Sequence, residues 1–410
     1  MIQRPRGTRD FLPSEMEHRR TVEQLMRGKA SLWGYREVCT PEFEELELFT
    51  ARSGQGIIEE MYVFEDKGGR MLALRPEITA AVQRMYLNEA KVAPKPLRWF
   101  YFADCFRYER PQKGRYRQFW QFGVELIGSD TAIGDAEVIM LADEILRSTG
   151  IGFDLHVGHL SFMKSLLTGL PSVEQRDAMR YLDKKDYPGL KNYLALSGKE
   201  DLFESLSVLP GCRTLDEVVS ITGEIPETGR ITEILDILDE AGTEYTLDPG
   251  IARGLDYYTG TVFEAFAENL GAENQILGGG AYHLAQVLGG DDVPSSGFAV
   301  GFDRVMVALG EPVEKPGMAV GIVYTPEARI HAVRVAQEFR AYGIRAEADV
   351  MGRGIGAQIA HASKSANVIV IVGERELRAG TVTLKDLKTG DQAEYSVSDA
   401  VREVETRGSR

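Results

Sequence analysis

The chain has 410 residues, more than one ordinary domain needs, so two or three domains are expected. Its hydrophobic fraction of 43% and charged fraction of 27% are typical of soluble globular proteins. No segment approaches the roughly 18 apolar residues of a membrane helix, so we expect no membrane partner. The net charge of −15 argues against indiscriminate nucleic-acid binding, although a local basic patch is compatible with it.

The cysteines and the amino terminus argue against zinc-binding or disulfide-rich proteins and against secreted proteins. Cys39, Cys105 and Cys212 lie far apart and form no CxxC pair, which argues against a zinc site or a disulfide framework. We therefore expect no metal-ligating residue. Residues 1–7 contain no apolar run, so no signal peptide is expected and the predicted location is cytoplasmic.

The first 150 residues predict helices and hairpins. Helical periodicity covers 14–34, and a strand follows at 35–41. Short runs at 61–65 and 70–74 flank a glycine pair and predict a hairpin, which a helix over 80–90 follows. Strands are predicted at 98–109 and 117–128, and a helix at 135–149 with Gly150 as its cap. So many hairpins predict a mainly antiparallel sheet.

The pattern changes at two places along the chain. Helical stretches interrupted by Gly and Pro fill 160–239, which predicts a helical insertion between two parts of one sheet domain, 1–159 and 240–311. Strands resume at 253–264, 278–282 and 294–301, and residues 312–317 read as a linker. In 318–410, strands and helices alternate, which indicates a separate α/β domain with a mostly parallel sheet. The expected fold class is α+β, with an antiparallel sheet flanked by helices and a C-terminal α/β domain.

The hairpin at 98–128 carries the most informative pattern. Residues two apart in a strand share a face, so Arg107 lies beside Glu109, and Gln121 and Gly123 lie beside Glu125. The opposite face of the second strand is apolar (Trp120, Phe122, Val124 and Leu126). The polar face suits an anionic, hydrogen-bonding ligand. The connecting loop carries four cations, Arg110, Lys113, Arg115 and Arg117, and a solvated turn is the alternative interpretation of the last three.

Three other segments place reactive side chains beside glycine or proline: 74–79, 253–260, and the pair 278–282 and 297–304. Each has a purely structural alternative. The first suits a helix start, because proline fits the first turn and glutamate complements the helix dipole. The second suits a turn with aromatic packing, and the third suits close packing of strand glycines. None is a P-loop or a dinucleotide-binding glycine motif.

Together these segments resemble a known family. Phe106–Glu109 looks like motif 2 of the class II aminoacyl-tRNA synthetases, and Arg110–Gln121 is very similar to the histidyl-tRNA synthetases. Residues 253–260 resemble that family's most specific segment. Further likenesses cover nearly the whole chain: Arg6–Asp10 with the family's amino terminus, Tyr35–Pro41 with the dimer-building motif 1, 297–304 with motif 3, and the last domain with its anticodon-binding domain.

The resemblance implies a ligase that activates L-histidine with ATP and Mg²⁺ and transfers it to the 3′ end of tRNA(His) as a homodimer. It implies ATP binding by Arg107, Glu109, Arg115, Arg253 and Arg304, with Arg107 and Arg253 catalytic at the α-phosphate. It implies histidine binding by Glu77, Thr79, Gln121, Glu125, Tyr258 and Tyr282. Contacts to the tRNA acceptor end fall to Arg110, Gln112 and Arg117. Arginine suits bidentate phosphate contact, and a carboxylate can accept an imidazole N–H while a phenol serves the other nitrogen.

The chain departs from the family at a few positions and leaves two alternatives open. Ile78 replaces a usual glycine, Ala281 and His283 replace arginine and aspartate, and Phe302 and Asp303 stand where Leu-Glu is common. A histidine-sensing regulatory subunit of ATP phosphoribosyltransferase is one alternative, but it should lack the anticodon-binding domain that follows Gly317. A class II enzyme for proline or threonine is the other, but it lacks a segment like 253–258.

Overall fold

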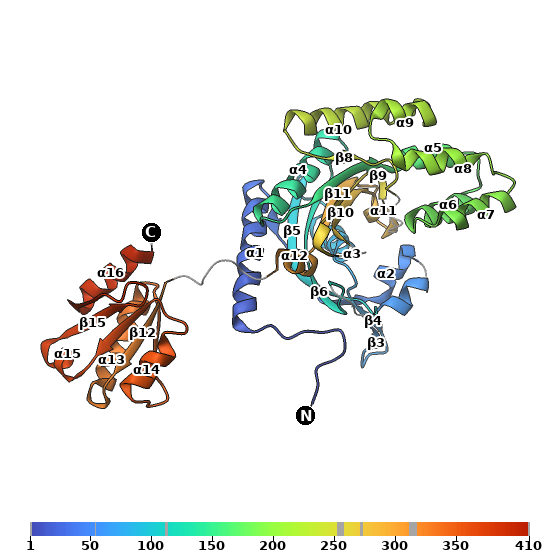
Figure 1. The fold of residues 1–410 in the computed structure, drawn as a ribbon. Helices are drawn as coiled ribbons and strands as arrows, with labels where there is room; N and C mark the ends of the chain where they lie inside the picture. Colours follow the sequence, from blue (N-terminus) through green and yellow to red (C-terminus); the bar gives the residue numbers. More distant parts are fainter. Residues whose placement is uncertain are drawn as a thin grey trace. The chain divides into compact units, whose positions relative to one another are not determined.

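The structure is a computed structural model that describes residues 2–53, 55–110, 114–251, 258–270, 274–310 and 318–408. The chain forms two compact units, Met1–Glu311 and Pro312–Arg410, which are described separately (Figure 1). Within the described ranges, no helix is both long enough and apolar enough to cross a membrane.

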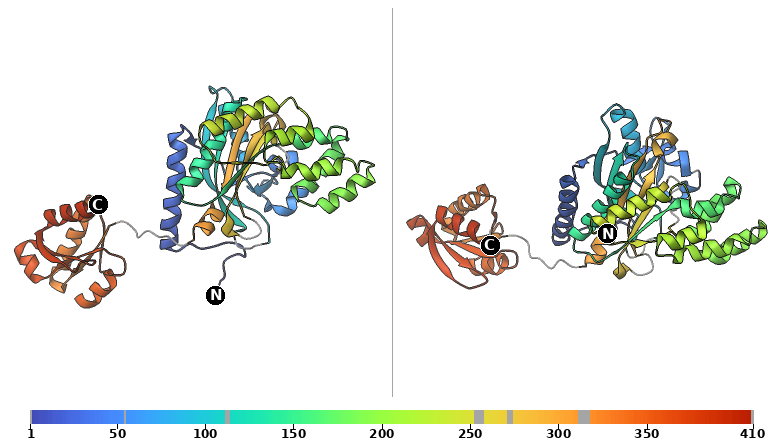
Figure 2. Two further views of the ribbon diagram at one scale, coloured as in Figure 1. Left: turned by 45° about the horizontal axis from the view of Figure 1, so that its top comes forward. Right: turned by 90° about the horizontal axis from the view of Figure 1, so that it is seen from above.

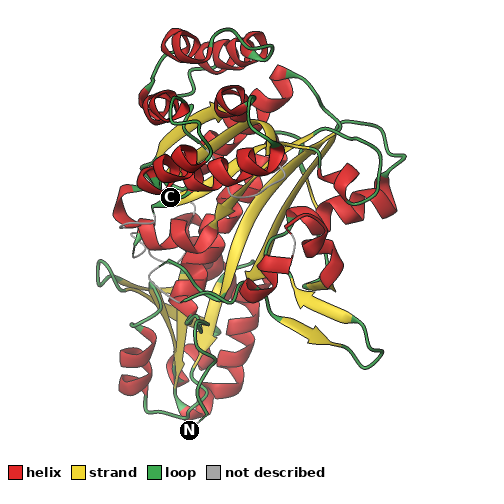
Figure 3. Cartoon of the chain, turned by 90° about the vertical axis from the view of Figure 1, so that its right-hand side faces the viewer, coloured by secondary structure: helices red, strands yellow, loops and turns green. Residues whose placement is uncertain are grey.

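Unit 1 is built on an eight-stranded sheet in the order β1-β5-β6-β11-β10-β9-β7-β8. Figure 3 shows its long central strands in yellow beside the red helices. The strands are β1 (Arg36–Glu37), β5 (Leu97–Phe106), β6 (Gln118–Ile127), β7 (Asp154–His159), β8 (Thr246–Leu247), β9 (Tyr258–Phe266), β10 (Gln275–Tyr282) and β11 (Ser295–Gly301). All neighbours are antiparallel except the two edge pairs, β1 with β5 and β7 with β8. The predicted antiparallel sheet is confirmed.

Helices cover one face of this sheet and enclose the main core. They are α1 (Pro13–Leu32), α4 (Ala132–Ser148), α10 (Thr228–Glu240) and α12 (Phe302–Leu309). Phe122, Val124 and Leu126 are fully buried beneath them, because the alternation of β6 turns these side chains to the helical side. Gly150 ends the α4 segment with a φ of 79°, as its predicted role as a cap requires.

Shorter elements complete the first part of unit 1. They are β2 (Phe43–Glu45), β3 (Val63–Glu65) and β4 (Met71–Leu74), which form a small antiparallel sheet, with α2 (Leu46–Ser53), a 3₁₀ turn (Gln55–Glu60), α3 (Thr79–Met85), a π-helical turn (Tyr86–Ala90) and α11 (Leu284–Val287). The strand predicted at 35–41 is shorter in the structure, Arg36–Glu37, and beyond it the Arg75 guanidinium donates to the carbonyls of Thr40 and Pro41.

Helices gather on one side of the large sheet between residues 160 and 222 (Figures 1 and 2, green). They are α5 (Leu160–Leu167), α6 (Ser172–Asp183), α7 (Tyr187–Leu196), α8 (Leu202–Val208), a 3₁₀ turn (Leu209–Gly211) and α9 (Leu215–Thr222). They enclose a core of their own. The next helix, α10, joins both cores: Ile231 packs with the helical group, whereas Ile234 and Leu238 pack beneath the sheet.

Unit 2 contains a five-stranded sheet in the order β13-β12-β14-β15-β16. Its elements are β12 (Ala319–Tyr324), a 3₁₀ turn (Pro326–Ala328), α13 (Arg329–Ala341), β13 (Arg345–Ala348), α14 (Ile355–Ala362), β14 (Val368–Val372), α15 (Glu374–Ala379), β15 (Thr381–Asp386), β16 (Gln392–Ser396) and α16 (Val397–Gly408). The predicted parallel order holds for β13, β12 and β14. It is wrong for β15 and β16, which are antiparallel. The link from Val372 to Thr381 is shorter than the dozen or so residues that a parallel crossover needs.

Candidate active site

A cavity of about 730 Å³ lies on the face of the large sheet opposite the main helices. Its lining includes ten of the residues singled out from the sequence: Glu77, Thr79, Arg107, Glu109, Arg115, Gln121, Glu125, Tyr258, Tyr282 and Arg304. Arg110 and Arg117 lie outside this lining. Arg253 and Gln112 lie outside the described residues. Side chains from α3, β6, β9, β10 and α12 therefore converge on one space.

Glu125 on β6 is the centre of the cavity's buried end. Its side chain is 1% exposed and accepts three hydrogen bonds from hydroxyl groups. Thr79 Oγ1 lies 2.8 Å and Tyr101 OH 3.3 Å from Oε1, while Tyr282 OH lies 2.5 Å from Oε2. The ring of Tyr258 packs edge-on against that of Tyr282 with a centroid separation of 6.5 Å. A carboxylate enclosed by phenols suits a small ligand with ring nitrogens.

Burial raises the pKa of Glu125 to about 8, because the charged form loses its contact with water. The hydrogen bonds from Tyr282, Thr79 and Tyr101 oppose this shift, whereas the nearby carboxylate of Glu77 adds to it. The carboxyl group therefore exchanges its proton near neutral pH.

Glu77 lies at the start of α3, close to Glu125. Its carboxylate accepts from the backbone N–H of Ala80 at 3.1 Å, so it caps the first turn as the structural interpretation expected. Burial raises the pKa of Glu77, while that N–H and the Arg107 cation act in the opposite direction. Ile78 has a φ of −112° and a fully buried side chain, so the backbone here does not require the family's usual glycine.

The cationic end of the cavity differs from the sequence prediction in one respect. The strand β5 ends at Phe106, so Arg107 and Glu109 lie beyond the strand and do not share a strand face as predicted. The Arg107 N–H still donates to Arg117 O, but the next two N–H groups turn elsewhere: Tyr108 donates to the Glu60 carbonyl and Glu109 donates back to Arg107. The Arg107 Nε donates to Pro76 O at 2.9 Å, and its guanidinium lies 5.1 Å from the Phe119 ring centroid.

Two further arginines of the cavity, and Arg117 outside its lining, are held by the surrounding chain. Arg115 forms an ion pair with Glu109, and Arg304 donates to the Gln275 carbonyl at 2.7 Å. Arg117 is partly buried, donates to Glu109 O at 3.1 Å and stacks on Tyr108 with 4.1 Å to the ring centroid. The solvated-turn interpretation is therefore wrong for Arg117. Lys113 lies outside the described residues, and Arg110 at the start of the loop is exposed.

Two glycines make the arrangement around Glu125 possible. Gly123 pairs with Tyr101, and a Cβ at Gly123 would lie 2.2 Å from the Tyr101 hydroxyl that reaches Glu125. Gly297 pairs with Glu125, and a Cβ there would lie 2.1 Å from Glu125 Oε2. Close approach of a side chain to the backbone therefore explains both glycines.

Gly297→Ala is expected to displace the Glu125 carboxylate and break its bond to Tyr282. Overpacking of this kind destabilises by about 1–3 kcal/mol. Thermal unfolding measures this loss, and calorimetry should show weaker binding of the cavity's ligand. Gly301→Ala on the same strand is the control for stability, because its Cβ would meet no atom closer than 3.6 Å. Equal melting temperatures for the two variants would contradict the steric argument.

Comparison with known proteins assigns the family. A family model described as histidyl-tRNA synthetase matches residues 7–305. The chain belongs to the histidyl-tRNA synthetase family. A model described as an anticodon binding domain matches residues 318–407. A histidine–tRNA ligase of Methanoregula boonei is 65% identical over 410 residues, which cover 100% of both chains.

Solved structures agree with this family. Apo histidyl-tRNA synthetase of S. aureus is 28% identical, with a TM-score of 0.75, and the match covers 98% of this chain and 100% of that one. A structure from Bacillus halodurans is described as an ATP phosphoribosyltransferase regulatory subunit/histidyl-tRNA synthetase. It is 26% identical, with a TM-score of 0.77 and coverage of 91% and 97%.

Two features of this synthetase site were missed by sequence reasoning. Tyr101 and Gln83 belong to the Glu125 network, but both sit in segments that read as ordinary core, so no local signal marked them. The second is a buried cluster beneath motif 3. Asp303 accepts from Arg9, from Arg19 at 2.7 Å and from the Trp120 backbone at 2.7 Å. In the sequence, only the likeness of Arg6–Asp10 to the family's amino terminus pointed to this cluster.

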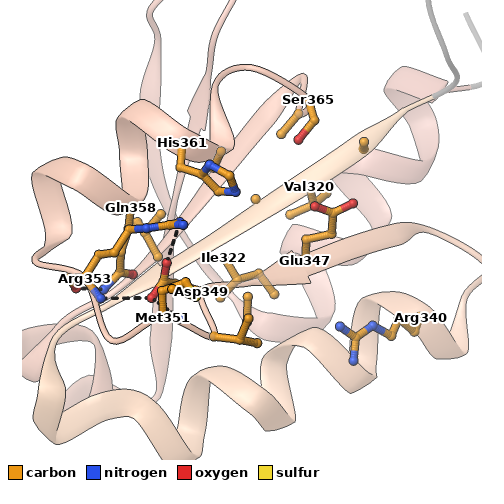
Figure 4. A pocket seen from close by; sticks show the side chains of 17 residues that line it. Val320, Ile322, Arg340, Glu347, Asp349, Met351, Arg353, Gln358, His361 and Ser365 are labelled. Atoms are coloured by element: carbon orange, nitrogen blue, oxygen red, sulfur yellow. Dashed lines mark hydrogen bonds and ion pairs between the residues drawn. The ribbon is translucent and has the colours of Figure 1, made fainter. Parts of the chain in front are cut away.

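The anticodon-binding unit has a cavity of its own, of about 510 Å³ (Figure 4). It is lined by residues of β12 and α14, which pack closely at Gly321, where a Cβ would lie 2.5 Å from Ala362 Cβ. His361 and Ser365 border it from the α14 side, and the Asp349–Arg353 ion pair lies at its other edge (Figure 4). This space is bounded by unit 2 alone.

Proposed function

We propose that the chain activates L-histidine with ATP to form histidyl-adenylate and pyrophosphate, and then transfers histidine to the 3′ end of tRNA(His). The observation that carries the proposal is the single cavity that joins a buried carboxylate among hydroxyls to a set of arginines. Family membership and the full-length likeness to histidine–tRNA ligases support it independently.

The buried end of the cavity suits histidine. Glu125 accepts one imidazole N–H, and Tyr258 serves the other ring nitrogen. Tyr282 and Gln121 border the ring, while Glu77 and Thr79 receive the α-amino group. A carboxylate near an ammonium group gains a charge-assisted hydrogen bond, which is stronger than a neutral one.

The cationic end suits ATP. Arg107 and Arg253 hold the α-phosphate, Glu109 and Arg115 lie near the adenine, and Arg304 stacks on the base and meets the γ-phosphate. The histidine carboxylate attacks the α-phosphorus, the bond to the bridging oxygen breaks, and pyrophosphate leaves. No protein nucleophile is needed, because a carboxylate is already nucleophilic. Catalysis rests on positioning and on charge stabilisation at the phosphate.

We infer that Mg²⁺ enters with ATP. In the described part of the chain, no three histidine, cysteine, aspartate or glutamate side chains gather to hold a metal ion. This fits Mg²⁺, which proteins usually bind through one or two carboxylates together with substrate phosphates. When bound, it would neutralise charge on the phosphates.

Transfer requires tRNA, and we assign its contacts to two regions. Arg110, Gln112 and Arg117 in the motif 2 loop meet the acceptor end, and the exposure of Arg110 supports this. The unit that matches the anticodon binding domain model takes the anticodon. The location we propose is cytoplasmic.

We also propose a homodimer built through the motif 1 region. Phe43, Phe64 and Met71 are 52%, 41% and 47% exposed. They lie on the three strands of the small sheet, which follows β1 in the chain. Exposed large apolar side chains that gather in one place favour an interface.

ATP–pyrophosphate exchange with each of the twenty amino acids tests the function. We expect exchange with L-histidine alone. Absence of exchange with every amino acid would favour the regulatory-subunit alternative. That alternative is disfavoured because the unit it should lack, residues 318–407, is present and matches the anticodon binding domain model.

A further inference from the structure

A buried glutamine outside the cavity lining is bonded to the histidine-binding end. Gln83 on α3 is 0% exposed, and its Nε2 lies 2.9 Å from the Tyr282 hydroxyl and 3.4 Å from Ser295 Oγ. Thr79 stands four residues earlier on the same helix, so one face of α3 reaches Glu125 twice. Thr79 does so directly, and Gln83 does so through Tyr282.

The direction of these hydrogen bonds follows from the donors available. An amide nitrogen only donates, and a hydroxyl has a single proton. Because Gln83 Nε2 donates to the Tyr282 oxygen, the Tyr282 proton goes to its other neighbour, Glu125 Oε2 at 2.5 Å. Ser295 behaves alike, since its Oγ donates to Val293 O and accepts from Gln83. The protons of the Tyr282 and Ser295 hydroxyls are both donated to other groups, so both oxygens accept a hydrogen bond from Gln83. The amide nitrogen of Gln83, and not its oxygen, therefore faces them.

The amide group is costly to keep in this place. Gln83 Oε1 is buried, and no group among the described residues donates a hydrogen bond to it. An unpaired buried acceptor loses its contact with water and gains nothing in return, which offsets the stability gained from the two Nε2 hydrogen bonds. What glutamine supplies at this position is therefore the Nε2 donor.

We propose that Gln83 is a positioning residue that directs the Tyr282 proton onto Glu125, so that the cavity selects ligands whose ring donates an N–H. Thr79 and Tyr101 donate to the other oxygen of Glu125, so both oxygens of the ionised carboxylate are acceptors. A ring that offers only acceptor atoms then finds no donor at Glu125. Without Gln83, the Tyr282 hydroxyl is free to turn and accept, and Glu125 can carry a proton toward the ligand.

Calorimetric binding to the full chain tests this inference, which rests on the proposed histidine site. The ligands are L-histidine and β-(2-thiazolyl)-L-alanine, whose ring has no N–H. Gln83→Leu should weaken histidine binding about tenfold, as expected for one hydrogen bond to a charged network, and weaken thiazolylalanine binding less. The melting temperature should change little, because removal of the unpaired oxygen offsets the loss of the two Nε2 hydrogen bonds. A lowered melting temperature with an unchanged affinity ratio would overturn the proposal. Gln83→Met repeats the measurement with an unbranched side chain.

Two controls separate positioning from packing. In a Tyr282→Phe background, Gln83→Leu should have no further effect on the affinity ratio, because Gln83 acts through the missing hydroxyl. An equal effect in both backgrounds would overturn the proposal. Gln358→Leu removes another buried amide, whose oxygen and nitrogen are both bonded to backbone. It should lower the stability of unit 2 and leave histidine affinity unchanged. Binding is measured without catalysis, so absence of exchange would refute the enzymatic function and leave the test of Gln83 intact.

Discussion

Arg107→Ala and Arg253→Ala are each expected to lower histidine-dependent ATP–pyrophosphate exchange by about 10²–10³-fold. Each removes one cation that we assign to the α-phosphate, and losses of this size are usual when a positioned donor to a developing charge is removed. For Arg107, the bond to Pro76 O and the packing on Phe119 hold the guanidinium in position. The fall should appear in kcat, because the interaction strengthens in the transition state.

Arg70→Ala is the control for these two variants. Arg70 pairs with Asp66 in the exposed turn of the β3–β4 hairpin and lies outside the cavity lining. It should retain exchange near that of the unmodified chain. Near-normal exchange by Arg253→Ala would remove that residue from the proposed mechanism, and the same result for Arg107→Ala would do so for Arg107.

Glu125→Gln is expected to lower kcat/KM for histidine by about 10²–10³-fold while it stabilises the fold. The activity falls because the ring N–H loses a buried charged acceptor, and truncation of such pairs costs a few kcal/mol. The stability rises because the buried charge is gone. Exchange kinetics and thermal unfolding of the same preparation measure the two effects.

The pH dependence of stability gives this prediction a definite sign. The pKa of Glu125 is about 8 in the folded chain and near 4.5 otherwise, so the folded state binds its proton more tightly. The contribution of protonated Glu125 to the free energy of unfolding is therefore fully present below pH 4.5 and is lost as the pH rises to 8. The advantage of Glu125→Gln should grow across that window and level off above it, at no more than about 5 kcal/mol.

Glu144→Gln provides a control of opposite sign. Bonds from Lys29 and Trp33 lower the pKa of Glu144, so its contribution is present at neutral pH and is lost as pH falls. This variant should be less stable at neutral pH and should activate histidine normally. If the melting temperatures of Glu125→Gln and of the unmodified chain differed by the same amount at every pH, the argument from burial of Glu125 would be contradicted.

Alternation along a strand let the sequence predict much of the cavity. The buried series Phe122, Val124 and Leu126 fixed which way β6 faces, and this placed Glu125 on the opposite face, which lines the cavity. The same rule failed for Arg107 and Glu109, because a contact with Glu60, far away in the chain, ends β5 before them. Strand ends depend on such distant partners, and local patterns do not contain them.

The network around Glu125 shows a second limit of prediction. Gln83 and Tyr101 act only through contacts with side chains from other strands, and each alone is unremarkable in a helix or strand. Arg115 and Arg304 were found because the resemblance covered their segments. The antiparallel edge of unit 2 could have been foreseen, since the distance along the chain between β14 and β15 is too short for a crossover.

The pairing of Arg9 with Asp303 has a consequence for biosynthesis. The two residues are 294 positions apart, and the same amino-terminal segment holds the Arg117 N–H through the carbonyl of Gly7. Synthesis runs from the amino terminus, so the segment made first waits for one of the last parts of unit 1 to leave the ribosome. The motif 2 loop is therefore held in place late in synthesis. The ATP-binding end of the cavity is complete only after motif 3 has left the ribosome.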